Sequence, residues 1–288
     1  LIEGGGKVEW YHPFSMKSLF RMNNRTHREL LVVDGRVGFI GGAGIADNWR
    51  YAKDDKDPRW RDTVARVEGD VVSNMQATFA ENWIESSGEI IAGEDYFPGD
   101  RPAGNTCAMV VDGSPSAGGS TRVRVLFQML VASARRSIHI TTPYFLPDRS
   151  LRRELVGAIE RGVEVKVIVP GVKADHLMTR TSSRMLYGDV LKAGGSIYEY
   201  QPAMIHAKIL IVDGKWTVMG STNCDFRSFG LNDEVNISFI SAEGAARLER
   251  DFEDDLRGCR EVNYEQWKRR PLHERMLEWS GWILRKQQ

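Results

Sequence analysis

The chain has 288 residues, of which 42% are hydrophobic and 27% charged, a composition typical of a globular protein with a sizeable core. Thirty-nine basic residues balance thirty-nine acidic ones, so the overall positive charge expected of a nucleic-acid-binding protein is absent. No apolar run approaches the length of a membrane-spanning helix. The three cysteines form neither a CxxC pair nor a metal-spaced cluster, so we expect a reducing, cytoplasmic setting.

The first half of the chain is built around the segment HRELLVVDGRVGFIGGAGIADNW, which begins at His27 and places Asp34 seven residues later. Asp62 then enters a short β-rich run, and an amphipathic helical stretch with a buried Phe79 follows. The Gly-, Ser- and Pro-rich run DGSPSAGGS, which begins at Asp112, is typical of a linker. We therefore place the first half at residues 1–112 and the linker at residues 113–120.

The second half, residues 121–288, alternates strands and helices. We expect strands at 137–142, 164–169 and 196–200, helices at 150–161 and 180–193, and a hairpin of 208–212 with 216–219. An amphipathic helix with a buried Phe252 follows. The alternation predicts an α/β layer with a mixed sheet.

The hairpin belongs to a second copy of the first-half segment, HAKILIVDGKWTVMGSTNCDFRS from His206. Asp213 again lies seven residues after the histidine, and Glu234 takes the place of Asp62 at the entrance to a strand. A repeat of this length predicts two similar halves. We therefore expect His27 and His206 to meet at one site across a pseudo-twofold axis.

The repeat also indicates that the first half is incomplete. Residues 121–205 precede the second histidine, but only 26 residues precede His27, so we expect the chain to begin part-way through its first half. Residues 1–10 then correspond to residues 191–200, where a Gly-Gly pair leads into a strand.

A basic and aromatic cluster lies near the C-terminus. Its members are Lys268, Arg269, Arg270, Arg275, Trp267, Trp279 and Trp282. Two interpretations stay open: a solvated helix face, or contact with an anionic membrane surface.

Paired histidines suit phosphodiester chemistry because a neutral imidazole attacks phosphorus without the charge repulsion that an anion meets. The second imidazole donates a proton to the departing alkoxide and then accepts one from the incoming alcohol. On a strand, His206 and Lys208 point to the same side, so both face one site.

Several polar residues surround the expected site. Lys208, Asn223 and Ser221 are the candidates for binding the non-bridging oxygens of the phosphate. Glu234 is the candidate partner that orients His206, and Asp62 is its counterpart for His27. For Asp213 two interpretations stay open, a turn residue or an active-site hydrogen bond, and we retain Asp213 and Asp34 among the catalytic candidates.

The pattern His206-x-Lys208-x4-Asp213-x6-Gly220-Ser221-x-Asn223 resembles the HKD motif of the phospholipase D superfamily at every position. The surrounding runs PYFLPD, MIHAKILIVDG and GSTNCDFRSFGLNDEVN are similar to those of bacterial cardiolipin synthases, and the resemblance covers essentially the whole chain. It implies a phospholipase D-like α/β fold: two pseudo-symmetric βα halves with mixed sheets flanked by helices, the first half incomplete. It also implies an active site between the halves that needs no metal or other cofactor.

The resemblance further implies a phosphatidyltransferase that makes cardiolipin from phosphatidylglycerol through a phosphohistidine. Its partner is a phospholipid at the cytoplasmic side of the bacterial inner membrane, contacted peripherally, with no nucleic acid. Two alternatives stay open: a phospholipase D-type hydrolase that transfers the same group to water, and a catalytically impaired lipid-binding relative.

The first copy departs from the family pattern at two positions, with Glu29 in place of Lys and Gly44 in place of Asn. Replacing a cation by an anion about 4 Å from a phosphate disfavours binding by up to roughly 8 kcal/mol at an effective dielectric near 20. Four interpretations therefore stay open: Glu29 is paired with Arg25, Arg25 supplies the missing cation and is oriented by Glu29, Glu29 is protonated, or this half has lost activity.

Glu29 also bears on the roles of the two histidines. The resemblance implies that His27 is the nucleophile and His206 the acid and base. A carboxylate beside His27 disfavours its neutral form and argues for the reverse. We keep the family order as the expectation.

Overall fold

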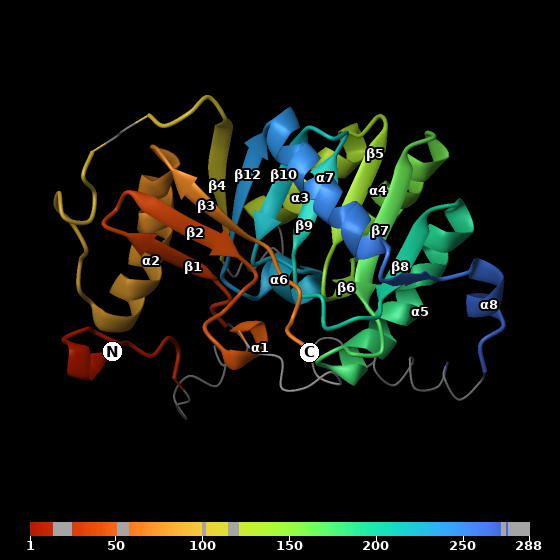
Figure 1. The fold of residues 1–288 in the computed structure, drawn as a ribbon, viewed down its shortest axis with the longest axis horizontal. Helices are drawn as coiled ribbons and strands as arrows, with labels where there is room; N and C mark the ends of the chain where they lie inside the picture. Colours follow the sequence, from red (N-terminus) through yellow and green to blue (C-terminus); the bar gives the residue numbers. More distant parts are fainter. Residues whose placement is uncertain (14–24, 51–57, 100–101, 115–120, 272–274, 276–288) are drawn as a thin grey trace.

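The structure is a computed structural model that describes residues 1–13, 25–50, 58–99, 102–114, 121–271 and 275. Its centre is an eight-stranded mixed sheet with the strand order β13-β8-β7-β5-β9-β10-β12-β4 (Figure 1). The strands are β4 (Cys107–Gly113), β5 (Ser137–Thr141), β7 (Glu164–Pro170), β8 (Ser196–Tyr200), β9 (Ile209–Val212), β10 (Trp216–Gly220), β12 (Glu234–Ile240) and β13 (Cys259–Glu261). Strands β5, β7 and β8 run parallel, whereas β9, β10, β12 and β4 pair antiparallel.

Helices cover both faces of this sheet. On one face lie α3 (Arg122–Ser133), α4 (Arg149–Glu160) and α5 (Leu177–Ala193), whose apolar sides form the main core with β5 and β7. On the other face α7 (Ala242–Leu256) packs through Leu248 and a Phe252 that is 3% exposed. Both faces are therefore dry, which explains the nearly continuous apolar run of β7.

The helices begin where the sequence supplies capping side chains. Asp148 accepts hydrogen bonds from the backbone N–H groups of Ser150 and Leu151 at the start of α4. Ser241 caps α7 in the same way. The structure confirms the strands and helices expected in the second half. Where an observed end differs from the expected one, the difference is one to three residues.

The first half forms a smaller unit. Strands β1 (Leu30–Val33), β2 (Val37–Gly41) and β3 (Val64–Glu68) form an antiparallel sheet that is covered by α2 (Val71–Ser87). Ile40 and Met75 are fully buried against β9, β10 and β12, so the small sheet packs on the same face of the large sheet as α7. Burying two such side chains contributes roughly 1.5–3 kcal/mol each to holding the halves together.

The two repeats fold into the same hairpin. Asp34 and Gly35 have φ of 53° and 59° between β1 and β2, and Asp213 and Gly214 have φ of 55° and 62° between β9 and β10. Positive φ at both central positions is what a type I′ turn requires, and Asp and Gly tolerate it better than most residues. The duplicated sequence therefore encodes a duplicated hairpin.

Three expectations for the first half are wrong. Residues 5–10 form no strand and follow a short 3-10 helix, η1 (Ile2–Gly4), because no neighbouring strand pairs with them in the described structure. Phe79 is 41% exposed because it lies on the outer side of α2. The boundary after residue 112 cuts through β4, which pairs along its whole length with β12 and so belongs with the second half.

Short elements complete the fold near the centre of the molecule. Strands β6 (Phe145–Leu146) and β11 (Cys224–Asp225) form a parallel pair, which is followed by α6 (Phe226–Gly230). The remaining helices are α1 (Asp47–Arg50) and α8 (Tyr264–Lys268). Among the described helices, none combines the length and the apolar character that a bilayer crossing requires.

Candidate active site

Two short parallel bridges join the halves and place the histidines. Thr26 bridges to Asp233, and the backbone N–H of His27 donates to the carbonyl of Asp233 at 2.8 Å. Arg61 bridges to Ile205, and the N–H of His206 donates to the carbonyl of Arg61 at 2.7 Å. Each histidine therefore lies beside the acidic residue of the other half.

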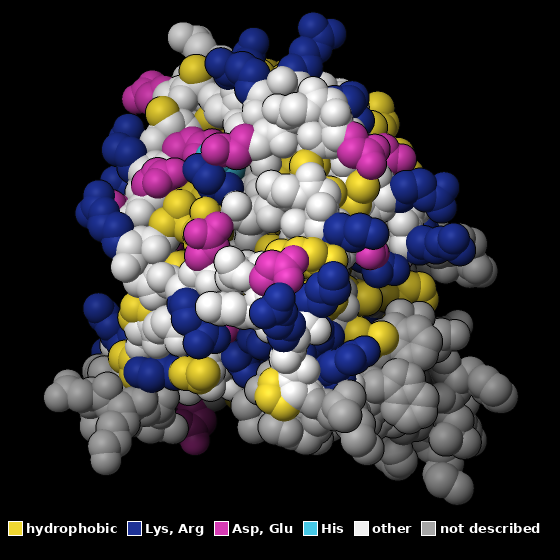
Figure 2. Space-filling model, turned by 90° about the vertical axis from the view of Figure 1, so that its right-hand side faces the viewer, with side chains coloured by type: hydrophobic (Ala, Val, Ile, Leu, Met, Phe, Trp, Pro, Cys, Tyr) yellow, Lys and Arg dark blue, Asp and Glu magenta, His cyan; other side chains and the backbone are white. Residues whose placement is uncertain are grey.

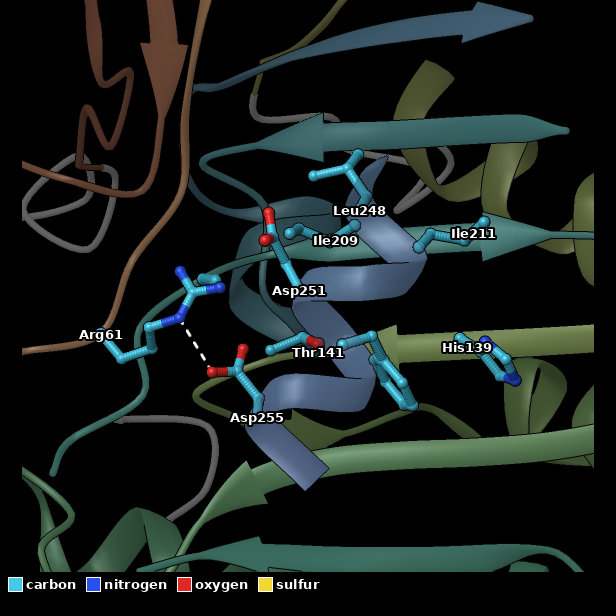
Figure 3. A pocket seen from close by; sticks show the side chains of 10 residues that line it. Arg61, His139, Thr141, Ile209, Ile211, Leu248, Asp251 and Asp255 are labelled. Carbon is cyan, nitrogen blue, oxygen red and sulfur yellow. Dashed lines mark hydrogen bonds and ion pairs between the residues drawn. The ribbon is translucent and has the colours of Figure 1, made fainter. Parts of the chain in front are cut away.

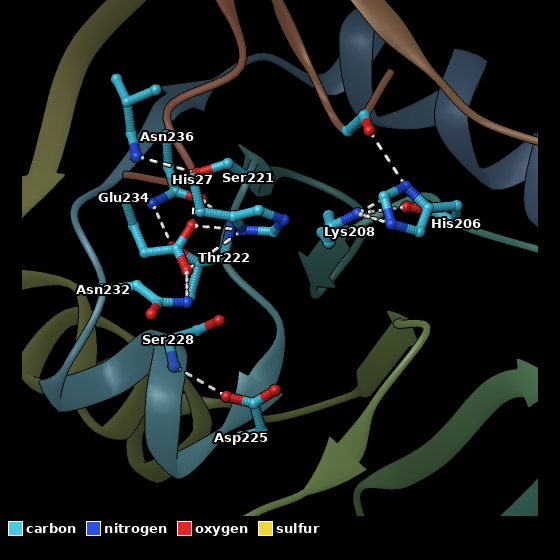
Figure 4. Close-up of polar contacts among 12 residues, drawn as sticks. His27, His206, Lys208, Ser221, Thr222, Asp225, Ser228, Asn232, Glu234 and Asn236 are labelled. Carbon is cyan, nitrogen blue, oxygen red and sulfur yellow. Dashed lines mark hydrogen bonds and ion pairs between the residues drawn. The ribbon is translucent and has the colours of Figure 1, made fainter. Parts of the chain in front are cut away.

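The carboxylates consequently pair with the histidines in a crossed arrangement. Nδ1 of His27 lies 3.0 and 3.2 Å from the carboxylate oxygens of Glu234 (Figure 4). Nδ1 of His206 lies 3.1 Å from Oδ2 of Asp62 and 2.9 Å from the carbonyl of Gly42. The expected pairs, His206 with Glu234 and His27 with Asp62, are wrong, because the bridges form between the halves and not within each half.

His27 is held by a fully buried carboxylate. Glu234 also accepts hydrogen bonds from the hydroxyl of Ser221 at 2.5 Å and the amide of Asn232 at 3.3 Å. Burial alone lowers the pKa of His27, but the charge and hydrogen bond of Glu234, aided by the charge of Glu29, raise it overall. The geometry favours the protonated form of His27.

His206 has the opposite balance. Burial lowers its pKa, the nearby charges of Lys208 and His27 lower it further, and Asp62 offsets only part of this effect. Nζ of Lys208 lies 2.7 and 3.0 Å from the two ring nitrogens and donates to the carbonyl of His206 at 2.7 Å. The geometry therefore favours the neutral form of His206.

Lys208 stands between the two rings in Figure 4, where the ring of His27 points toward it. The side chain is buried, and burial lowers its pKa to about 8. The charges of four carboxylates oppose this effect by raising the pKa, and those of Asp62 and Glu234 act most strongly. A cation held among carboxylates is well placed to stabilise an anionic phosphate between the imidazoles.

The two departures in the first half meet in space. A Cβ atom added at Gly44 would lie 3.4 Å from both carboxylate oxygens of Glu29, so the missing side chain leaves room for this carboxylate. Arg25 is exposed and forms no ion pair with Glu29 in the described part of the chain. Burial raises the pKa of Glu29. The charges of His27 and Lys208 lower this pKa, those of Asp62 and Glu234 raise it, and the overall direction is upward.

Asn223 and Ser221 differ in what they offer to a phosphate. Asn223 is 4% exposed, and its amide N–H groups are the ones that can donate to a phosphate, whereas its carbonyl oxygen has no hydrogen-bond partner among the described residues. Ser221 donates to Glu234 and accepts from the N–H of Val235 at 3.0 Å, so it supports the carboxylate of Glu234 and is not a free phosphate ligand.

The structure assigns the motif aspartates to turns. The carboxylate of Asp213 accepts from the backbone N–H groups of Arg135, Arg136 and Ser137, and these bonds lower its pKa against the effect of burial. It lies at the amino end of β5, opposite the end at which Lys208 precedes β9. Asp34 occupies the equivalent turn, so the structure favours the turn interpretation for both aspartates over the catalytic one.

Residues 127–256 match the family described as cardiolipin synthase, PLD-like domain. The chain is 34% identical over 284 residues to cardiolipin synthase 1 of Bacillus anthracis, covering 96% of this chain and 55% of that protein. It is 34% identical over 281 residues to the major cardiolipin synthase ClsA of Bacillus subtilis, covering 96% and 58% respectively. The chain is similar to members of the phospholipase D superfamily.

This phospholipase D-like chain spans little more than half the length of the relatives that it matches. Among solved structures, phosphatidylserine synthase of Haemophilus influenzae aligns with a TM-score of 0.68 at 13% identity, covering 91% of this chain and 68% of that one. At this identity the likeness concerns the fold alone, and it confirms the expected fold class.

Sequence reasoning missed two tryptophans of the phospholipase D-like site. Nε1 of Trp49 donates to Oδ2 of Asp62 at 3.0 Å, and the rings of Trp49 and Trp60 have centroids 5.5 and 5.3 Å from the ring of His206. Trp49 and Trp60 both precede Asp62 in the sequence, but nothing in the surrounding sequence indicates that they enclose His206 of the other half.

Arg61 is a further residue that the sequence did not single out. Its Nε lies 2.9 Å from Oδ1 of Asp255 on α7, as Figure 3 shows, and its guanidinium donates to the hydroxyl of Thr63. The ion pair fixes the segment that carries Asp62 against the second half. Arg61 therefore positions a carboxylate that itself positions His206.

The C-terminal cluster is partly folded into the domain. Nε1 of Trp267 donates to the carbonyl of Arg184 on α5, and Arg270 lies over the Trp267 ring at 4.0 Å. Trp279 and Trp282 lie outside the described residues.

Proposed function

We propose that this chain carries the active site of a phosphatidyltransferase that makes cardiolipin from phosphatidylglycerol through a phosphohistidine. The observation that carries the proposal is the pair of imidazoles with opposite pKa shifts, each held at Nδ1 by a carboxylate of the other half. A hydrogen bond from Nδ1 to a carboxylate fixes the tautomer and leaves Nε2 for chemistry. The names of the relatives support the same activity.

In the first step Nε2 of His206 attacks phosphorus. A P–N bond forms as the P–O bond to the glycerol headgroup breaks, and Nε2–H of His27 gives its proton to the departing oxygen. Lys208 and Asn223 bind the non-bridging oxygens as negative charge grows there. This order reverses the one expected from the family, because Glu234 and Glu29 favour a protonated His27.

In the second step the hydroxyl of another phosphatidylglycerol gives its proton to His27. Its oxygen forms the new P–O bond while the P–N bond breaks, so both histidines return to their starting states. Glu29 is protonated while the phosphate is bound, since the added anion strengthens the shift that burial already causes.

The lipid reaches the site from a membrane surface, which we place at the cytoplasmic face of the bacterial inner membrane. Figure 2 shows that Lys and Arg side chains are frequent on the face at the β13 edge of the large sheet. Arg257 and Arg269 are among the exposed cations of this region, at 79% and 83% side-chain exposure. Such residues favour anionic lipid headgroups.

The test is to incubate the full-length protein with phosphatidylglycerol vesicles and to analyse lipids and released glycerol. Cardiolipin together with glycerol supports the proposal, and His206→Ala should abolish both products. Phosphatidic acid with glycerol, but without cardiolipin, would identify a hydrolase. The absence of all three products would identify a lipid-binding relative without activity.

A further inference from the structure

A hollow that is open to solvent lies beside the candidate active site. It is lined at the carboxyl ends of β5 and β7 by Pro143, Tyr144, Val169 and Pro170. Because Thr141 of β5 pairs with Ile209 of β9, the same edge of the sheet carries His206 and Lys208. Ligands of α/β proteins bind at the carboxyl ends of parallel strands.

Direct contacts connect this hollow with the phosphate-facing residues. The hydroxyl of Thr142 accepts from the N–H of Cys224, the residue after Asn223, and donates to the carbonyl of Tyr144. The hydroxyl of Tyr144 donates to Asp175 at 2.6 Å. Burial lowers the pKa of Lys208, and the charge of Asp175 is among those that oppose it, so the rim of the hollow is within electrostatic reach of the site.

Two residues that line the hollow carry buried polar atoms without partners. Ser183 is 4% exposed, and its hydroxyl has no hydrogen-bond partner in the described part of the chain. The same is true of Nε of Arg180. Buried polar atoms are nearly always satisfied, because leaving one unpaired costs roughly 1–3 kcal/mol. Two such atoms in one hollow indicate a ligand that accepts hydrogen bonds.

The charge balance indicates an anion. Three guanidinium groups, those of Arg180, Arg184 and Arg260, surround the single buried carboxylate of Glu199. Arg260 lies 2.8 Å from this carboxylate and Arg184 is closer still, whereas Arg180 is 3.5 Å away. The charge of Glu199 is thus balanced without Arg180, the arginine that lines the hollow.

We infer that this hollow binds the phosphodiester headgroup of the acceptor lipid, with Arg180 and Ser183 as its ligands. The inference rests on the proposed function and adds the source of its acceptor specificity. Phosphatidylglycerol as acceptor carries an anionic phosphate a few bonds from its attacking hydroxyl, so binding that phosphate beside the phosphohistidine orients the hydroxyl. Neither water nor free glycerol carries such a phosphate.

The experiment measures cardiolipin formed per glycerol released from phosphatidylglycerol vesicles by the full-length protein. We expect Arg180→Gln and Ser183→Ala to lower this ratio about tenfold and about threefold, while initial glycerol release changes less than threefold. The matched control is Arg260→Gln, which also removes a cation from Glu199 but does not line the hollow, and it should leave the ratio unchanged.

A second arm uses a short-chain phosphatidylcholine as donor and free glycerol as acceptor. Arg180→Gln should form phosphatidylglycerol at the wild-type rate, since this acceptor has no phosphate. An unchanged cardiolipin ratio in Arg180→Gln, or an equal fall in Arg260→Gln, would overturn the inference. A wild-type protein that releases no glycerol from phosphatidylglycerol would instead overturn the proposed function.

Discussion

The pKa values of two chemically identical side chains move in opposite directions, and this is the central property at the residue scale. His27 faces the buried carboxylate of Glu234 and the partly buried one of Glu29, whereas His206 has Lys208 beside it. Burial penalises both imidazolium forms, so the sign of the neighbouring charges decides which ring holds a proton. In the proposed mechanism the environment thus separates the two roles, acid and nucleophile, between otherwise equivalent residues.

A leaving group that needs no proton should separate these roles. With a p-nitrophenyl phosphodiester, His27→Ala should keep a burst of p-nitrophenol, because the phenolate leaves without an acid. His206→Ala should show no burst. With phosphatidylglycerol both variants should lose at least about 100-fold in kcat. Stopped-flow absorbance checks the first result, and a burst that survives only in His206→Ala would restore the family order.

Glu29 provides a second residue-scale prediction. If it acts in its protonated form, Glu29→Gln should keep kcat/KM within about threefold, whereas Glu29→Ala should lose about tenfold. Because its pKa is raised, the wild type loses the protonated form as pH increases, and Glu29→Gln should decline less on the alkaline side. Glu81→Gln, at an exposed ion pair with Arg28, is the control. A large gain in Glu29→Lys would instead indicate a weakened first half.

The duplicated hairpin is the feature that matters at the element scale. Each copy uses Asp and Gly with positive φ to reverse the chain, which directs the following strand back along the preceding one. In the second copy the Asp213 carboxylate also binds three backbone N–H groups at the start of β5. The motif aspartate is therefore a structural residue that secures the strand order at the amino end of β5.

We predict that Asp213→Ala lowers the free energy of unfolding by about 2 kcal/mol, from lost hydrogen bonds and strain at positive φ. Asp213→Asn keeps an acceptor oxygen and tolerates this φ, so it should cost less than about 1 kcal/mol. Urea denaturation followed by circular dichroism measures both variants. Neither should change kcat of the folded protein, and a 100-fold loss in Asp213→Asn would return this residue to the catalytic set.

The crossing of the carboxylates is a property of the whole molecule. Neither His27 nor His206 is oriented by a carboxylate of its own half, so the site exists only when the bridges between the halves have formed. The apolar contacts of Ile40 and Met75 and the ion pair of Arg61 with Asp255 maintain this arrangement. Assembly of the halves and assembly of the site are therefore one event.

Histidine titrations followed by NMR should reveal the crossing. Asp62→Asn should lower the pKa of His206, and Glu234→Gln should lower that of His27, each by about one to three units, because each change removes a neighbouring negative charge. In plots of activity against pH, Asp62→Asn should move the acid limb, which follows His206, to lower pH. Glu234→Gln should move the alkaline limb, which follows His27, to lower pH. Shifts in the opposite pairs would contradict the crossed arrangement.

The amino-acid sequence by itself determined the duplicated motif and the strands and helices of the second half. It also determined the polar residues His206, Lys208 and Asn223. All of these depend on local periodicity and on the chemistry of single side chains. The tertiary structure alone decided which carboxylate meets which histidine and which aspartates only form turns. It also decided that tryptophans enclose His206. These features depend on contacts between distant segments, and a repeat predicts two similar halves without specifying how they interlock.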